Sequence, residues 1–224
     1  YCAVPTVLVM MQPDFGTAFV FICIMVFIYF IGRISWGYIL TAAGGLAVCM
    51  PLAYYFVLSD SQRERIDVFI NPESDLQNSG YNVAQSKIAI GSGQLTGKGF
   101  FSEGTLAQLR FVPERHTDFI FAGIVEGLGF VGGTIIICLF FALIFRWIYI
   151  AMRTKDSFGT CLVVGVAGMF TAHVFENIGM TIGLMPVTGI PLPFISYGGS
   201  NLLTNLIGVG IVENVWMRRQ SKKR

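Results

Sequence analysis

The chain has 224 residues, of which 54% are hydrophobic and 12% are charged, and its formal net charge is +2. Soluble domains carry roughly 25% charged residues, so this composition indicates an integral membrane protein. The small net charge gives no reason to expect a nucleic-acid partner. The five cysteines lie in apolar stretches without CxxC or Cys/His spacing, which predicts free thiols and no zinc site.

Apolar stretches of about 20 residues, the length that crosses a bilayer, recur along the chain. They predict a single all-α domain over residues 1–224, a polytopic transmembrane helical bundle. Tyr1–Met11 begins inside an apolar run without an initiator methionine, so we expect the chain to be the C-terminal part of a longer protein. The predicted spans, in order, are Phe15–Ile31, Tyr38–Leu58, Phe119–Ile150, Cys161–Leu184 and Leu202–Trp216.

The stretch Phe119–Ile150 is too long for one straight crossing of a bilayer. Its first part contains Glu126 among several glycines, a combination that does not favour a continuous lipid-facing helix. We therefore predict a broken or interfacial segment there, followed by the span proper over Phe130–Ile150.

A polar loop, residues 59–118, separates the two groups of spans and carries six bases and eight acids. Helical spacing predicts short helices within it at Arg63–Asn71 and Tyr81–Ala89. The loop is either an ordinary solvated surface or a site for an anionic substrate. The basic C-terminal tail, Arg218–Arg224, is predicted to be cytoplasmic, which places this loop and the turn Pro186–Ser200 on the outer face.

Two features of the loop are candidates for chemistry. The run Gly97-Lys98-Gly99 could bring backbone N–H groups and an ammonium to a phosphate, or it could be a plain turn. At the end of the loop, Asp118 follows Glu114 and His116 where the chain re-enters the membrane. Partial desolvation there would make Asp118 a useful general base, whereas the alternative is an N-cap for the next helix.

Polar residues also interrupt the apolar spans. His173 and Glu176 lie three residues apart on one helical face, so we expect a structural contact between them or with a neighbour. Asp14 either caps a helix or contacts substrate. The turn Pro186–Ser200 cannot be helical, because it contains three prolines and three glycines. Since it is apolar, we expect it to pack against protein or line a cavity, with its hydroxyl groups on the same side as Asp118.

Several motifs occur in order: Gln-Pro-Asp-Phe-Gly-Thr, Gly-Tyr-Asn-Val-Ala-Gln-Ser, Pro-Glu-Arg-His-Thr-Asp-Phe-Ile-Phe-Ala, Asn-Ile-Gly-Met and Gly-Ile-Pro-Leu-Pro-Phe-Ile-Ser-Tyr-Gly-Gly-Ser. On these motifs the chain resembles the SEDS family (the RodA/FtsW/SpoVE group), and Tyr81–Gly93 with Gly97-Lys98-Gly99 is most like the RodA branch. The resemblance implies about ten helices in the whole protein and a bacterial inner-membrane location.

By this resemblance the protein is a peptidoglycan glycosyltransferase that polymerises lipid II for cell-wall elongation, with Asp118 as its catalytic base. No cofactor is implied with certainty, although a divalent cation (Mg or Mn) could assist. The implied partners are lipid II, membrane lipids and a class B penicillin-binding protein. The candidate substrate-binding residues are Asp14, Gln85, Ser86, Lys98, Glu114, Arg115, His116, Thr117, Ser196, Tyr197 and Ser200.

Two other classes of function fit the composition. A lipid II flippase, or another membrane transporter, would suit the polar residues inside the spans. A non-catalytic scaffold for a transpeptidase fits less well with an intact His-Thr-Asp run. The sequence therefore favours the enzyme, with the transporter as the alternative.

Overall fold

The structure, a computed structural model, describes residues 3–10, 12, 14–31, 37, 41, 44–45, 60–71, 79–99 and 117–221. All regular secondary structure in these residues is helical, which confirms the predicted all-α class. The helices are α1 (Ala3–Met10), α2 (Phe15–Ile31), α4 (Asp60–Ile70), α5 (Ser79–Ser92), α6 (Ile120–Arg153), α7 (Ser157–Ile182) and α8 (Gly199–Ser221).

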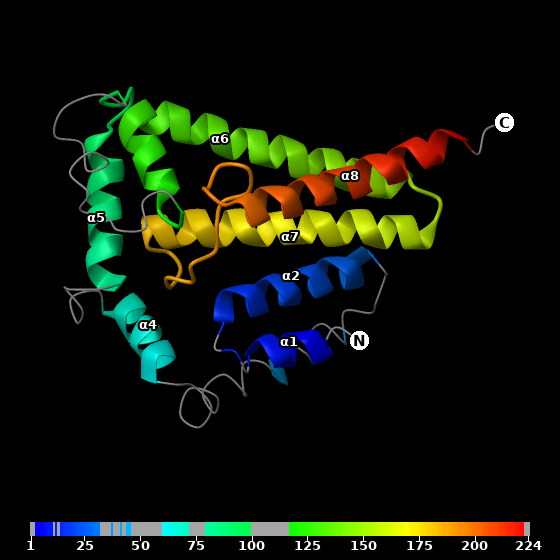
Figure 1. The fold of residues 1–224 in the computed structure, drawn as a ribbon, viewed down its shortest axis with the longest axis horizontal. Helices are drawn as coiled ribbons and strands as arrows, with labels where there is room; N and C mark the ends of the chain where they lie inside the picture. The colour runs from blue at the N-terminus through cyan, green and yellow to red at the C-terminus, as the bar shows by residue number, and fades with distance from the viewer. Residues whose placement is uncertain are drawn as a thin grey trace.

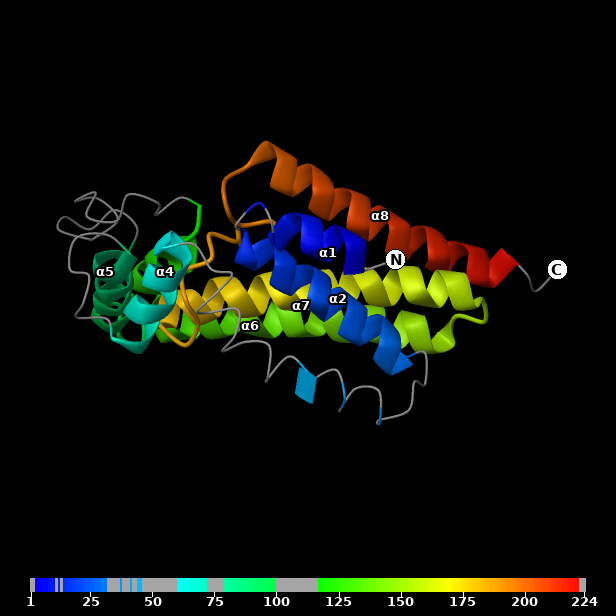
Figure 2. The same ribbon diagram turned by 90° about the horizontal axis from the view of Figure 1, so that it is seen from below.

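The three C-terminal helices α6, α7 and α8 run along one another, and α2 packs chiefly against α7 (Figures 1 and 2). The two short helices α4 and α5 lie together at one end of this bundle, whereas the C-terminus of α8 lies at the opposite end. The segment between α7 and α8 folds back at the same end as α4 and α5. That end therefore gathers α4, α5 and the irregular segment before α8.

The spans predicted from the sequence correspond closely to the helices. Among the described residues, α6 and α7 are long and apolar enough to cross a bilayer, and α2 is a shorter apolar helix. The predicted span Leu202–Trp216 falls inside α8, and the two predicted loop helices correspond to α4 and α5. The predicted span Tyr38–Leu58 lies almost entirely outside the described residues.

The core of the bundle is aromatic and aliphatic. Trp147 of α6 meets Phe170 of α7 edge to face, with 4.7 Å between the ring centroids. Where α2 crosses α7, a Cβ placed on Gly168 would lie 3.1 Å from the Cβ of Phe27. Small residues allow transmembrane helices to approach this closely, and van der Waals packing then stabilises the pair.

The helix α6 is broken, as its sequence predicts. Gly129 has φ 73° and ψ −175°, a conformation outside the helical region that essentially only glycine adopts. The break separates a short first part, residues 120–128, from the long part of α6 (Figure 1). The long part continues to Arg153, three residues beyond the predicted end of the span at Ile150. The first part of α6 therefore runs in a different direction from the long part (Figure 1).

The helix α7 has well-defined ends. Asp156 is its N-cap and accepts a hydrogen bond of 3.0 Å from the backbone N–H of Gly159. Gly183 ends it in a left-handed conformation with φ 77°. At this end α5 contributes the buried hydroxyl of Ser86, which donates to the carbonyl of Thr181 at 2.6 Å. The helix α5 is thereby attached directly to the end of α7.

Candidate active site

Asp118 lies in a turn immediately before α6, at the same end of the bundle as α4 and α5. The N-cap position of α6 is Phe119, which is buried and makes no side-chain capping bond. The cap therefore falls one residue after Asp118, so the alternative that Asp118 serves as this N-cap is not supported. The Asp118 side chain is half-buried.

Two side chains fix the backbone around Asp118. The Nδ2 atom of Asn177 on α7 donates to the Asp118 carbonyl at 2.9 Å and to the Ile190 carbonyl at 2.8 Å. The hydroxyl of Ser196 donates to the Thr117 carbonyl at 2.6 Å and accepts from the backbone N–H of Leu192 at 2.8 Å. Both bridges join the Asp118 segment to the turn between α7 and α8.

The turn itself brings backbone up to the carboxylate. A Cβ placed on Gly189 would lie 3.5 Å from Oδ2 of Asp118, and Gly189 has φ 77°. The Asp118 carboxylate therefore lies close to the main chain at Gly189, where no side chain separates the two. The Ser196 hydroxyl lies beside the Asp118 segment, as predicted, and the backbone of the turn is irregular.

The three hydroxyl residues of the turn differ in their surroundings. Ser196 is buried and bonded to backbone, so its hydroxyl serves to hold the turn in place. Tyr197 is 82% exposed, and Ser200 is exposed at the start of α8. Of these three residues, only Ser196 makes a hydrogen bond to the Asp118 segment within the described part of the chain. A role for Tyr197 and Ser200 in binding substrate stays a prediction.

The other candidate residues are distributed around the site. Ser86 is fully buried and bonds only to carbonyls, which gives it a structural role. Asp14 accepts from the backbone N–H of Thr17 at 3.0 Å and from its hydroxyl at 2.7 Å, so it caps α2. Gln85 is half-buried on α5. Glu114, Arg115 and His116 lie outside the described residues, so their predicted roles stay predictions.

The segment Gly97-Lys98-Gly99 forms a turn and does not present its backbone N–H groups to a phosphate. The backbone N–H of Lys98 donates to the Glu126 carbonyl, and that of Gly99 donates to the Gly127 carbonyl, each at 3.0 Å. The Lys98 ammonium lies 3.8 Å from the Glu126 carboxylate. Because these N–H groups are used within the protein, they are not directed at a ligand, and the plain-turn alternative is the one observed.

The expected contact between His173 and Glu176 is not formed. Both carboxylate oxygens of Glu176 and the Nδ1 atom of His173 are buried without a hydrogen-bond partner among the described residues. Among the described residues, the Glu176 carboxylate therefore makes no hydrogen bond to His173 or to another neighbour, which contradicts the predicted pair.

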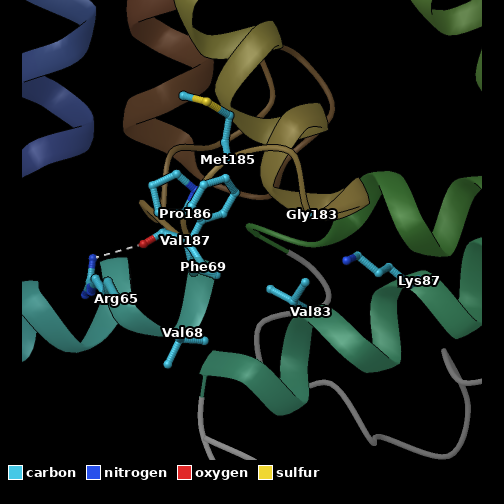
Figure 3. Close-up of a pocket in the computed structure, with 9 residues that line it drawn as sticks. All are labelled: Arg65, Val68, Phe69, Val83, Lys87, Gly183, Met185, Pro186 and Val187. Carbon is cyan, nitrogen blue, oxygen red and sulfur yellow. Dashed lines mark hydrogen bonds between the residues drawn. The ribbon is translucent and has the colours of Figure 1, made fainter. Parts of the chain in front are cut away.

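A small pocket lies beside the site, between α4, α5 and the segment after α7 (Figure 3). Its volume of about 20 Å³ is enough for about one water molecule, so it is not a substrate cavity. At its edge the Arg65 guanidinium donates to the Val187 carbonyl at 3.3 Å, as Figure 3 shows. The pocket thus marks where α4 is attached to the start of the turn that carries Gly189.

Asn177 is the residue of the site that sequence reasoning missed. It is fully buried, and one amide group bridges two segments that are 59 and 13 residues away in the sequence. An asparagine inside an apolar helix was the available signal, because a buried amide needs partners.

We predict that Asn177→Leu weakens both the fold and the site. Leucine fills a similar volume but cannot donate, so the carbonyls of Asp118 and Ile190 lose their bonds at a cost of about 1–3 kcal/mol for each buried acceptor. The melting temperature of the purified full-length protein measures the effect. Asn205→Leu is the matched control, because the buried Asn205 donates only to Asn201 of its own helix. Equal losses in the two variants would contradict the bridging role.

The fold and site define a class: a helical membrane protein with a carboxylate held over irregular backbone at one end of its bundle. Comparison with known families places the chain within that class. The family profile named for FtsW, RodA and SpoVE, and described as "Cell cycle protein", matches residues 1–221. The chain belongs to this family and is an integral protein of the bacterial inner membrane.

Three curated relatives illustrate the range of similarity. The chain is 44% identical over 216 residues to peptidoglycan glycosyltransferase MrdB of Escherichia coli, covering 96% of this chain and 58% of MrdB. It is 42% identical over 163 residues to peptidoglycan glycosyltransferase RodA of Treponema pallidum, covering 73% of this chain and 37% of that protein. It is 40% identical over 209 residues to the probable peptidoglycan glycosyltransferase FtsW of Trichlorobacter lovleyi, covering 93% and 54%. The chain thus matches between 37% and 58% of the length of these three relatives.

Two solved structures share the fold. A chain of a peptidoglycan synthase complex that coordinates polymerization and crosslinking superposes with a TM-score of 0.78 at 30% identity, covering 98% of this chain and 61% of that one. The rod shape determining protein RodA of Thermus thermophilus superposes with a TM-score of 0.62 at 26% identity, covering 96% and 53%. Both structures support a polytopic helical architecture for the described helices.

Proposed function

We propose that the full-length protein is a peptidoglycan glycosyltransferase that polymerises lipid II, with Asp118 as its general base. The observation that carries the proposal is the position of the Asp118 carboxylate, held over Gly189 by backbone bonds to Asn177 and Ser196. The names of relatives at 44% and 42% identity support the same reaction class. Tight anchoring of a half-buried acid suits a base that must accept a proton in one geometry.

In the proposed reaction, the 4-hydroxyl of an acceptor GlcNAc attacks the anomeric carbon of a MurNAc joined to undecaprenyl pyrophosphate. The new C–O bond forms as the bond to pyrophosphate breaks, with inversion to a β-1,4 linkage. Asp118 accepts the hydroxyl proton, and the pyrophosphate leaves with the electron pair of the broken bond. Arg115, three residues before Asp118 in the sequence, is proposed to offset the charge that develops on the leaving group.

A divalent cation, Mg or Mn, is the other candidate for neutralising the pyrophosphate. Among the described residues, no three His, Cys, Asp or Glu side chains come together as a metal-binding group.

A lipid II flippase is the alternative. The two functions differ in what happens to the substrate, because a polymerase joins disaccharides and a flippase only moves them between leaflets. Proteoliposomes that contain the full-length protein and labelled lipid II in both leaflets separate the two. We expect glycan strands to appear, and their formation should stop when Asp118 is changed to asparagine. Movement of intact lipid II without strands would favour the flippase.

We further propose that residues 59–118 and the Pro186–Ser200 turn face the outside of the cell, with the C-terminus of α8 in the cytoplasm. The proposal rests on the basic residues at the opposite end of the bundle, which include Arg153 and Arg218. The extracytoplasmic side is also where the proposed reaction would build cell wall.

We predict opposite labelling of the two ends. In a background without native cysteines, Thr96→Cys and Lys155→Cys place thiols at exposed positions at the two ends of the bundle. An impermeant thiol reagent applied to intact cells should label the first, and the second only after the cells are opened. Labelling of the second alone in intact cells would invert the orientation.

The proposed partner is a class B penicillin-binding protein that crosslinks the new strands. The support is structural similarity to a chain of a complex that coordinates polymerization and crosslinking. We propose a role in elongation and cell shape, which the identity of 44% to MrdB over 96% of this chain supports. Co-purification of the full-length protein with a transpeptidase from its own cells tests the partnership.

A further inference from the structure

The turn after α5, residues 93–99, lies directly against the break in α6. Four backbone hydrogen bonds join them. The N–H groups of Lys98 and Gly99 donate to the carbonyls of Glu126 and Gly127, each at 3.0 Å. After the break, the N–H of Phe130 donates to the Gln94 carbonyl at 2.8 Å, and the N–H of Val131 donates to the Leu95 carbonyl at 3.2 Å. The turn thus bonds to both sides of Gly129.

The two backbones touch without intervening side chains. A Cβ placed on Gly97 would lie 2.2 Å from the carbonyl oxygen of Gly127. A Cβ on Gly93 would lie 2.2 Å from the carbonyl oxygen of Val125, and one on Gly129 would lie 2.3 Å from the backbone nitrogen of Gly97. Because the obstacles are main-chain atoms, neither segment can move without the other.

A charge pair closes this junction. The Glu126 side chain is 1% exposed, yet its Oε1 atom lies 3.8 Å from the Lys98 ammonium and accepts from the Ser92 hydroxyl at 3.4 Å. A buried carboxylate needs a counter-charge or hydrogen bonds, because its desolvation is costly. Lys98, itself 41% exposed, supplies that charge from the turn.

The junction holds one end of the segment whose other end carries the proposed base. Residues 120–128 form the short first part of α6 in Figure 1, with Asp118 just before it and Glu126 near its end. Asn177 and Ser196 hold the Asp118 end, whereas Lys98 and the 93–99 turn hold the Glu126 end. A rigid helix fixed at both ends leaves the carboxylate little freedom.

We propose that Lys98 and Glu126 are positioning residues, which orient residues 120–128 so that the Asp118 carboxylate stays in place over Gly189. The expected effect on the reaction rate rests on the proposed function, whereas the expected effect on the orientation of residues 120–128 does not. Neither side chain needs to touch the substrate for the effect to occur. The pair would act on the rate of the chemical step, since a displacement of about 1 Å can cost on the order of a hundredfold in rate.

The kinetic test uses the full-length protein with lipid II and four variants: Lys98→Gln, Lys98→Arg, Glu126→Gln and the double variant Lys98→Gln/Glu126→Gln. We expect Lys98→Gln to lower kcat by about tenfold or more while KM changes by less than about twofold. Lys98→Arg should retain most of the wild-type rate, because the positive charge is kept. The double variant should retain more activity than Lys98→Gln alone, because no buried carboxylate is left without its counter-charge.

Matched controls remove charges of the same type elsewhere. Lys155→Gln and Glu213→Gln change exposed residues outside the junction and should leave kcat and KM unchanged. A rise in KM at constant kcat in Lys98→Gln would overturn the proposal and assign Lys98 to substrate binding. Unchanged kinetics in both single variants would also overturn it.

A second measurement does not depend on activity. Hydrogen exchange of the purified full-length protein should show faster exchange in residues 120–128 of Lys98→Gln, with no change in α8. If Lys98→Gln exchanges faster but the wild type makes no glycan, the structural role of Lys98 and Glu126 is supported and the proposed function is rejected. If exchange is unchanged and the wild type is active, the positioning role of Lys98 and Glu126 is rejected and the proposed function is supported.

Discussion

Changing Asp118 to asparagine is expected to abolish glycan synthesis while leaving the protein folded and inserted in the membrane. The amide has nearly the same shape, and the bonds that hold this segment use the backbone carbonyls of Thr117 and Asp118, which the substitution leaves in place. An amide cannot accept the acceptor's proton. Loss of a general base typically costs about a hundredfold to ten-thousandfold in rate.

The measurement compares full-length wild type and Asp118→Asn at matched expression, with lipid II binding determined alongside strand synthesis. Asp118→Glu is the companion variant, because it keeps the charge but displaces it by one methylene, and we expect partial activity. Strand synthesis near the wild-type level in Asp118→Asn would remove Asp118 from the chemistry. Loss of binding together with activity would make it a binding residue and not the base.

The second large effect is expected at Gly129, where alanine should destabilise the protein strongly. A residue with a Cβ in this conformation costs about 1–3 kcal/mol in backbone strain. The added Cβ would also lie 2.3 Å from the Gly97 nitrogen and 2.4 Å from the Leu95 carbonyl oxygen. Overpacking of this kind typically costs about 1–3 kcal/mol more, and main-chain obstacles cannot rotate away.

Gly123→Ala is the matched control for Gly129→Ala, because it lies in the short first part of α6 with nothing within 4 Å of its Cβ position. Thermal unfolding of the full-length protein in detergent, followed by size-exclusion chromatography, measures both variants. We expect a large fall in melting temperature for Gly129→Ala and almost none for Gly123→Ala. Similar melting temperatures for both would show that the break in α6 can relax.

Local patterns in the sequence predicted the helices well, including the irregularity of α6. A stretch too long for one crossing, with Glu126 and several glycines at its start, indicated a break, and the structure places that break at Gly129. Spacing of apolar residues likewise predicted α4 and α5 to within a few positions. These features depend on residues close together in the chain, which is why the pattern alone carries them.

The arrangement around Asp118 depends on contacts between distant segments, and the sequence did not reveal it. Asn177 reaches the Asp118 carbonyl across 59 residues, and Ser86 reaches the Thr181 carbonyl across 95. The pairing of Lys98 with Glu126 was likewise not predicted, because the two residues lie in separate segments of the chain. Residue type predicted that each needed a partner, but only the fold could identify it.

The most direct test of the central claim is stoichiometric. Purified full-length protein is supplied with labelled lipid II, and the glycan strands and the released undecaprenyl pyrophosphate are measured together. A lipid II polymerase should release one undecaprenyl pyrophosphate for each β-1,4 bond formed, and both products should be absent in Asp118→Asn. Lipid II that is bound or moved between leaflets but recovered intact, with neither product formed by the wild type, would contradict the account.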